Sequence, residues 1–369
     1  MDMNQNVPHG AEVFKLMPGD INHLFRRSGL NGGSLSPFSY QAEQAAVSAP
    51  SPAFKALAES PAFFQAARKL LAPDLKILIQ RGGAGTADDS YHALMTRDDE
   101  GVLIQLTNSR GELLLLMFPD SGAFLQWWSG VYASAGAGDY RAVFPEGLEL
   151  EVLVCALHCI DLYRRFHMES MLEYRDLAGI SISTPDFMGI LKRSLAGADQ
   201  RWLLPALFEL TPGLKNSRVK LQPEHLKKLE ELGFISINER QVITMAERTA
   251  AMGAEFLQTW TGAAGCWAGA LLNGEERVLS RVFIAFTAFA THLFSFETGS
   301  GGERRFRHQA AAGAELKTTL GKWMESLRGA IGAAAVAPAA AEPRPKFCGR
   351  CGSKIRPDKK FCTGCGAPL

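Results

Sequence analysis

Residues 76–118 read KILIQRGGAGTADDSYHALMTRDDEGVLIQLTNSRGELLLLMF, and this stretch decides the fold class. It holds four apolar runs of strand length, at residues 76–80, 91–96, 102–107 and 112–118. The segments DDEG and NSRG separate the last three runs and are polar, glycine-containing turns typical of β-hairpins. The stretch therefore predicts an antiparallel sheet.

Helices are predicted on both sides of these strands. One begins near Pro61 and carries apolar residues on one face until Pro73 ends it. Another covers residues 122–132 and contains Trp127 and Trp128. The order helix, four strands, helix predicts an α+β fold in which helices pack on an antiparallel sheet.

A second block with a similar order follows nearer the C-terminal end. Its predicted elements are three strands and a helix, at residues 281–288, 291–297, 304–309 and 314–327. Setting residues 108–111 beside residues 300–302 brings the two blocks into register, and Trp323 gives the second closing helix its own tryptophan. We interpret the pattern as an internal duplication of sheet-plus-helix units around a helical centre. Two unrelated β–β–α units remain the alternative, and the phenylalanines between residues 283 and 289 also fit a helix.

The centre of the chain is predicted to be mainly helical. A long apolar helix is expected over residues 148–174, and a shorter one over residues 202–210. Residues 223–232 form an amphipathic helix that Gly233 caps, and a short β-hairpin at residues 234–245 leads into another helix. Helix, glycine, hairpin and helix in this order resemble the C-terminal half of a winged-helix domain.

In DNA-binding members of the winged-helix fold, a helix enters the major groove and the hairpin contacts phosphate. Basic residues around the segment are Lys215, Arg218, Lys220, Lys227, Lys228 and Arg240. The candidate recognition helix, EHLKKLEEL, also carries glutamates that offset its lysines. DNA binding and a structural or protein-contact role therefore both stay open for this segment.

The C-terminal residues 346–369 read KFCGRCGSKIRPDKKFCTGCGAPL and contain two CxxC pairs, which we predict to bind one structural Zn²⁺ ion. Four thiolates satisfy tetrahedral zinc, and a two-residue gap lets both sulfurs of a pair reach one metal. A phenylalanine precedes each pair and a glycine follows it, where the backbone must turn sharply. The predicted ligands are Cys348, Cys351, Cys362 and Cys365.

This pattern resembles the short zinc-ribbon family, FCxxCG…FCxxCGxxL, over residues 347–369. The resemblance implies two zinc knuckles bridged by short strands around a structural zinc. A redox CxxC site is the rival interpretation, but neither pair has the strand and helix of a thioredoxin-like motif around it. So small a module should be unfolded without metal. Four cysteine ligands also leave no position for a catalytic water.

Charge is divided unevenly between this module and the rest of the chain. Residues 341–369 carry seven Lys or Arg and two Asp or Glu, a formal charge of +5, which leaves −4 on residues 1–340. A basic ribbon on an acidic body could contact nucleic acid or an acidic protein surface. A solvated surface that only keeps the module soluble is the alternative.

These patterns divide the chain into six segments. The first three are a partly irregular arm at residues 1–50, a first α+β unit at 51–145 and the helical region with the winged-helix-like segment at 146–270. The last three are a second α+β unit at 271–328, an Ala/Pro linker at 329–346 and the zinc ribbon at 347–369. Within the arm, residues 14–25 are expected to contain one short helix.

Length and composition are those of a globular protein with several domains. The chain has 369 residues, of which 47% are hydrophobic and 21% charged, with a formal net charge of +1. Global disorder and a disulfide scaffold are excluded by these values and by the presence of only seven cysteines. No secretory signal is apparent, and the most apolar stretch, residues 282–296, is too short to span a bilayer. We therefore expect a cytoplasmic protein without membrane insertion.

Other candidate sites are weak. Cys155, His158 and Cys159 share one helix face but lie among apolar residues, so they are predicted to belong to the core, as is Cys266. The glycine-rich residues 81–85 lack the spacing of a phosphate-binding loop and are predicted to form a hairpin loop. His92, His292 and His308 have no partner recognisable in the sequence. No catalytic motif is found, so no enzyme activity is predicted.

Two functional classes remain. The first is a non-catalytic adaptor or chaperone-like protein, whose α+β body recognises a protein partner while the ribbon makes a second contact. Duplicated sheet-plus-helix units around a helical centre are similar in architecture to EspG-type secretion chaperones, although no motif supports that similarity. The second class is a nucleic-acid-binding regulator that uses the winged-helix-like segment and the basic ribbon.

Overall fold

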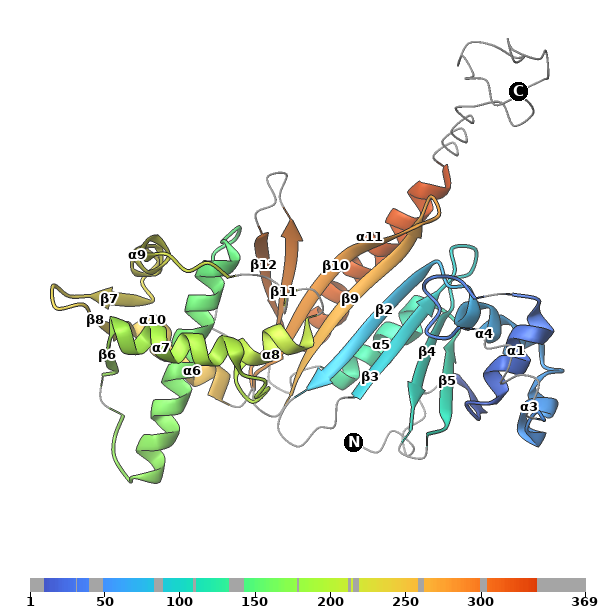
Figure 1. Cartoon of the computed structure of the whole chain (residues 1–369), viewed down its shortest axis with the longest axis horizontal. Coiled ribbons are helices and arrows are strands. Elements are labelled where there is room, and N and C mark those ends of the chain that lie inside the picture. Colours follow the sequence, from blue (N-terminus) through green and yellow to red (C-terminus); the bar gives the residue numbers. More distant parts are fainter. Residues whose placement is uncertain are drawn as a thin grey trace, which may run out of the picture.

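The fold is known from a computed structural model and is built around one nine-stranded sheet (Figure 1). The structure describes residues 10–30, 32–39, 49–82, 89–108, 111–132, 143–177, 179–211, 214, 219–257, 262–298 and 304–336. The strand order is β1-β5-β4-β3-β2-β9-β10-β11-β12, and every neighbouring pair is antiparallel. The predicted α+β class with a large antiparallel sheet is confirmed.

The first half of the sheet follows the predicted apolar runs closely. Its strands are β2 (Leu75–Gly82), β3 (Asp89–Met95), β4 (Val102–Thr107) and β5 (Leu113–Phe118). In β2 buried and half-buried residues alternate from Leu75 to Ile79, as expected when one face of a strand is covered more fully than the other. The helix α5 (Ser121–Tyr132) then crosses one face of the sheet.

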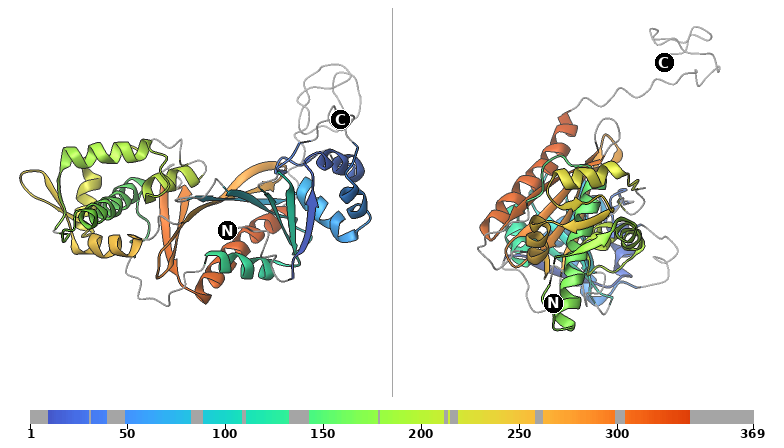
Figure 2. Two further views of the ribbon diagram at one scale, coloured as in Figure 1. Left: turned by 90° about the horizontal axis from the view of Figure 1, so that it is seen from below. Right: turned by 90° about the vertical axis from the view of Figure 1, so that its left-hand side faces the viewer.

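The second half repeats this order of elements. Its strands are β9 (Ala263–Leu272), β10 (Glu275–Phe286), β11 (Thr291–Thr298) and β12 (Arg304–Ala311), and the helix α11 (Ala314–Val336) follows them. Because β2 and β9 are neighbours, the two halves extend in opposite directions from the centre of the sheet. Helices α5 and α11 lie together on one face of the sheet (Figure 2). There the ring centroids of Trp128 and Trp323 are 5.8 Å apart.

Two details of the second half differ from the sequence predictions. The strand β9 lies in the segment that was predicted to be part of the helical region, because its alanines and glycines give little β-signal. The strand predicted at residues 281–288 is present within β10, so the alternative of a helix for its phenylalanines is wrong. Helix α11 continues to Val336, so the predicted linker does not begin at residue 329. Alanine favours helix there, and Ile331 is buried.

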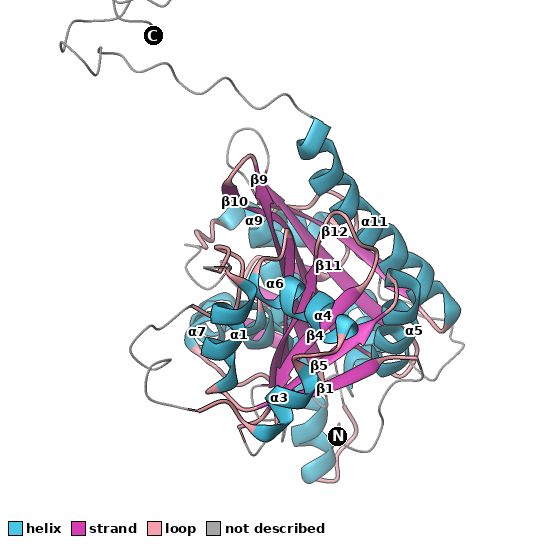
Figure 3. Ribbon diagram, turned by 90° about the vertical axis from the view of Figure 1, so that its right-hand side faces the viewer, coloured by secondary structure: helices cyan, strands magenta, loops and turns pink. Residues whose placement is uncertain are grey.

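The N-terminal residues cover the other face of the first half. The strand β1 (Glu12–Leu16) pairs with β5 and buries Phe14 and Leu16, so the helix predicted over residues 14–25 is wrong for these two. The helix α1 (Asp20–Ser28) follows β1, and the helices α3 (Pro52–Leu57) and α4 (Pro61–Leu71) complete the cluster. Figure 3 shows these helices away from α5 and α11, on the opposite side of the sheet.

A helical module packs against the second half of the sheet, on the side where α1, α3 and α4 cover the first half. Its helices are α6 (Leu150–Leu172), α7 (Thr184–Ala196), α8 (Leu203–Leu210), α9 (Pro223–Glu231) and α10 (Glu247–Glu255). They surround a small sheet of β6 (Ser181–Ser183), β7 (Ile235–Ile237) and β8 (Val242–Met245), with the strand order β6-β8-β7. This is the module that contains the winged-helix-like segment.

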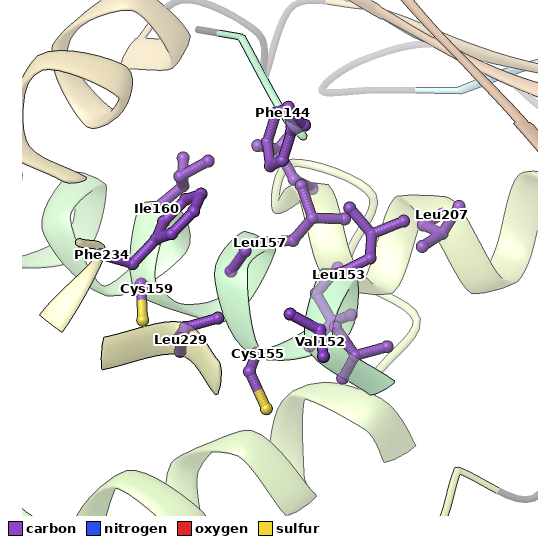
Figure 4. Packing of buried hydrophobic residues seen from close by; sticks show 14 of the residues in the cluster. Phe144, Val152, Leu153, Cys155, Leu157, Cys159, Ile160, Leu207, Leu229 and Phe234 are labelled. Atoms are coloured by element: carbon purple, nitrogen blue, oxygen red, sulfur yellow. The ribbon is translucent and has the colours of Figure 1, made fainter. Parts of the chain in front are cut away.

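The N-terminal half of α6 is the centre of the module's core. Nearly every residue from Leu150 to Leu162 is buried, because helices pack around α6 on several sides. Figure 4 shows Leu153, Leu157 and Leu207 within this packing. The same cluster includes phenylalanines of β10, β11 and β12, so the module and the sheet share one apolar core.

Candidate functional site

The cysteines of the body are buried packing groups. Cys155, Cys159 and Cys266 are free thiols, and burial raises the pKa of Cys155 to about 12 and raises that of Cys159 further above its ordinary value. Such thiols are protonated and unreactive at neutral pH. Within the part of the chain that the structure describes, no three His, Cys, Asp or Glu side chains are placed to hold a metal ion.

His158, between the two cysteines of α6, is also a core residue. Its ring lies edge-on to Phe187 with centroids 4.7 Å apart, and burial lowers its pKa to about 3. The imidazole is therefore neutral at ordinary pH. The prediction that Cys155, His158 and Cys159 are core residues rather than ligands agrees with this environment.

The structure does bring together two histidines that have no recognisable partner in the sequence. His292 of β11 and His308 of β12 are buried, and His292 Nδ1 lies 3.0 Å from His308 Nε2. His292 Nε2 lies 2.8 Å from Oε1 of Glu255, the last residue of α10. The backbone N–H of Phe144 donates to His308 Nδ1 at 3.4 Å.

These contacts fix the direction of the hydrogen-bonded chain. Since His308 Nδ1 accepts from the Phe144 N–H, its Nε2 carries the hydrogen and donates to His292 Nδ1. His292 Nε2 then donates to the Glu255 carboxylate. Burial and the neighbouring His292 lower the pKa of His308 to about 3, which keeps its ring neutral. These hydrogen bonds tie the end of α10 to the sheet. No apolar pattern in the sequence could have predicted them.

A buried ion pair holds the start of α8 against α6. Arg164 donates to Asp161 at 2.8 Å, and both side chains are almost fully buried. The Asp161 carboxylate also accepts from the backbone N–H groups of Leu203 and Leu204, each at 2.9 Å, and so caps α8. Burial raises the pKa of Asp161, while the Arg164 guanidinium and these two N–H groups oppose that rise. This network is structural.

The winged-helix-like segment presents a charge-balanced surface. On α9, Lys228 pairs with Glu231 at 3.2 Å, and Glu230 accepts from the backbone N–H of Ile237 at 2.8 Å. A groove of about 550 Å³ lies between α7, α9 and the β7–β8 hairpin. Leu226 and Met188 give it an apolar floor, and Lys227, Glu230 and Glu239 line it with charges of both signs. The predicted basic residues Lys215 and Arg218 lie outside the described residues.

The C-terminal end of α6 carries an exposed apolar surface, which we call the α6 tip (residues 171–174). The side chains of Met171, Leu172 and Tyr174 are 64%, 79% and 98% exposed. Tyr174 has a left-handed backbone, with φ of 54°, and its N–H bonds to the Met171 carbonyl, so the helix ends there with the ring in solvent. In Figure 1 this end of α6 extends beyond the neighbouring helices.

The predicted zinc ligands Cys348, Cys351, Cys362 and Cys365 lie outside the described residues. The donor set can therefore be judged from its chemistry only. Four thiolates in two CxxC pairs complete a tetrahedral zinc shell without water, which is a structural rather than a catalytic arrangement.

Residues 347–369 match the family model of the zinc-ribbon domain. The match implies that the C-terminal module binds zinc. It covers the ribbon alone and not the body. No curated protein matches the chain, and nothing found supports the similarity of the body to EspG-type chaperones.

Of the glycine-rich residues 81–85, Arg81 and Gly82 are the last two residues of β2, which pairs with β3, and residues 83–88 lie outside the described part. Among the described helices, none is both long enough and apolar enough to cross a bilayer.

Proposed function

We propose that this chain is a non-catalytic, zinc-binding interaction protein of the adaptor or chaperone-like kind. Its α+β body recognises a protein partner, and the zinc ribbon makes a second contact. The observation that carries the proposal is the α6 tip, where three large apolar side chains are exposed within four residues. Adjacent exposed apolar groups of this kind are typical of protein–protein contacts.

The surroundings of the α6 tip suit a partner with an apolar centre and a polar rim. Glu173 and Arg175 form an ion pair next to Tyr174, and Glu169 and Asp176 are exposed close by in the sequence. Polar rims around apolar anchors are usual in protein interfaces, and tyrosine is enriched at their centres. The buried, protonated thiols of the body offer no reactive group that would favour an enzyme instead.

A nucleic-acid-binding regulator is the second candidate. The element order α6, β6, α7, α8, α9, β7, β8 and the sheet order β6-β8-β7 favour it, because apart from the additional helix α8 they extend the winged-helix resemblance to the whole module. The charges on α9 speak against it. Glu230 and Glu231 lie on the exposed side of α9, which would face the phosphates of bound DNA. Lys228 on the same helix already forms an ion pair with Glu231.

A matched pair of variants separates the two functions. The wild-type full-length chain should purify with one stoichiometric protein partner, and the variant Met171→Ser with Leu172→Ser should lose about tenfold or more in affinity for that isolated partner. The control is Phe64→Ser, since Phe64 is similarly exposed and belongs to α4, a helix that lies far from α6 in Figure 1. Equal binding by both variants would contradict the assigned surface. A salt-sensitive shift in the electrophoretic mobility of duplex DNA would favour the regulator if it is lost when the chain is truncated at Ala340.

A further inference from the structure

The strand β12 is the last strand of the nine-stranded sheet, and residues 143–149 join the helical module to it. The Phe306 N–H of β12 donates to the Leu148 carbonyl at 3.2 Å, and Glu149 forms an isolated β-bridge with Arg305. Residues 143–149 lead directly into α6, the helix around which the module packs. A change in how these residues are held to β12 would therefore alter how the module is held to the sheet.

A chain of hydrogen bonds through two buried histidines links this edge of the sheet to α10. His308 Nδ1 accepts from the Phe144 N–H, and His308 Nε2 donates to His292 Nδ1. His292 Nε2 donates to the carboxylate of Glu255, the last residue of α10. Each of the four ring nitrogens therefore already acts as a donor or an acceptor, and two neutral rings satisfy the whole chain.

One additional proton cannot join this chain without the loss of a hydrogen bond. Burial and the neighbouring His292 lower the pKa of His308, which leaves His292, beside the Glu255 carboxylate, to carry the charge. A protonated imidazole donates from both nitrogens, so His308 Nε2 must become an acceptor and His308 Nδ1 must take up the hydrogen. The His308 Nδ1–H and the Phe144 N–H would then be two donors that face each other. At 3.4 Å this contact is also the longest of the three, so it is the one that is lost.

We propose that this chain is an acid-sensitive latch, which we call the histidine latch, between residues 143–149 and the sheet. At neutral pH the Phe144 N–H closes the latch. When the chain takes up one proton, the Phe144 contact opens, while the contact between His292 and Glu255 becomes an ion pair and persists. Acid therefore loosens residues 143–149 from β12 and leaves α10 attached to β11. The inference goes beyond the proposed adaptor function and does not depend on it.

The strands around the histidine latch place uncharged side chains opposite it. Opposite His292 lie Ala285 of β10 and Ala310 of β12. The charged residues of β12 near His308 lie on the opposite face of the sheet, because side chains alternate along a strand. These residues are Arg305 and Arg307.

Charged groups on the helices around the histidine latch have partners of their own. Arg248 of α10 donates to the Val143 carbonyl and keeps its charge at every ordinary pH. His225 of α9 lies 3.7 Å from Glu149, so its protonation in acid would strengthen that contact rather than weaken it. The titratable side chains of α6, which packs against α10, are the protonated thiols of Cys155 and Cys159, the neutral ring of His158, the Asp161–Arg164 pair and the phenol of Tyr163.

Hydrogen exchange of the Phe144 amide, resolved by NMR in the full-length chain, tests the histidine latch. From about pH 7.5 to about pH 5 we expect its protection, corrected for the intrinsic exchange rate, to fall about tenfold for each pH unit below the midpoint of opening. The control is the Leu271 amide, which donates to the Asp74 carbonyl at 3.0 Å without any histidine and should keep its protection. Over the same range the nitrogen-15 shifts of His308 should show the hydrogen moving from Nε2 to Nδ1.

Glutamine variants connect this response to the histidines. The double variant His292→Gln with His308→Gln keeps the chain without a titratable ring, because a glutamine amide both donates and accepts, so protection of Phe144 should no longer depend on pH. Glu255→Gln should move the opening to lower pH, since the carboxylate favours the charged ring. The matched control is His92→Gln, which replaces a half-buried histidine bonded to Gln105 and should leave the response unchanged.

The wild-type chain alone can overturn the proposal. Protection of the Phe144 amide that stays constant down to about pH 5 would do so, because the latch would then not respond to acid. An equal fall in protection at Phe144 and Leu271 would also do so, since it would report unfolding of the whole body. Among the variants, a pH response in the double glutamine variant equal to that of the wild type would have the same consequence.

Discussion

Replacing Gly265 with alanine is expected to lower the free energy of unfolding of the body by more than about 4 kcal/mol, or to prevent folding. Gly265 lies in β9, where the end of α8 crosses the sheet, and an alanine Cβ would overlap the backbone carbonyl of Leu210. Because that carbonyl belongs to the backbone, no rotamer change can relieve the overlap. Urea denaturation followed by circular dichroism measures the loss.

Gly130→Ala is the matched control for this substitution. Gly130 lies in α5, and its added Cβ would meet no neighbouring atom within 4 Å. Alanine favours helix over glycine, so the free energy of unfolding should stay the same or rise by up to about 1 kcal/mol. Equal destabilisation by the two alanines would show that α8 does not approach β9 as described.

Asp161→Ala should destabilise the body by about 3–5 kcal/mol. The substitution leaves the buried Arg164 guanidinium without its carboxylate and removes the acceptor for two N–H groups at the start of α8. The same denaturation experiment measures this loss. Glu275→Ala, which breaks the exposed pair with Arg277, is the control and should cost less than about 1 kcal/mol. A loss at Asp161 no larger than at Glu275 would contradict the buried network.

Local patterns in the sequence predicted the elements that combine an apolar period with clear turns. The strands β2 to β5 and the helices α4, α5 and α9 lie close to their predicted bounds, and Gly233 has the positive φ expected of a helix cap. The aligned blocks also correspond to antiparallel hairpins in the two halves of the sheet.

Elements specified by long-range packing were not predictable in the same way. The strand β9 is rich in alanine and glycine because α8 and the neighbouring strands approach it closely, and such a composition carries little β-propensity. The strand β1 is a strand only because β5 offers its edge. His292, His308 and Glu255 meet only after β11, β12 and α10 pack together, so their spacing in the sequence carries no signal.

The zinc ribbon is the opposite case, since its signal is entirely local. Two FCxxCG units define it, and the family match covers the same residues. The body requires contacts between residues far apart in the chain, whereas the ribbon requires a metal. Because so small a module cannot build an apolar core, its folding should depend on zinc while that of the body should not.

The account's central claim is that the body carries a separate structural zinc module. The zinc content of the reduced full-length chain tests this claim most directly. We expect about one zinc ion per chain, its loss in Cys362→Ser, and its retention in Thr363→Ala, a non-ligand neighbour within the same CxxC pair. Chelation should remove the zinc without changing the unfolding midpoint of the body. A zinc content far below one ion per chain, full retention in Cys362→Ser, or unfolding of the body on chelation would contradict the account.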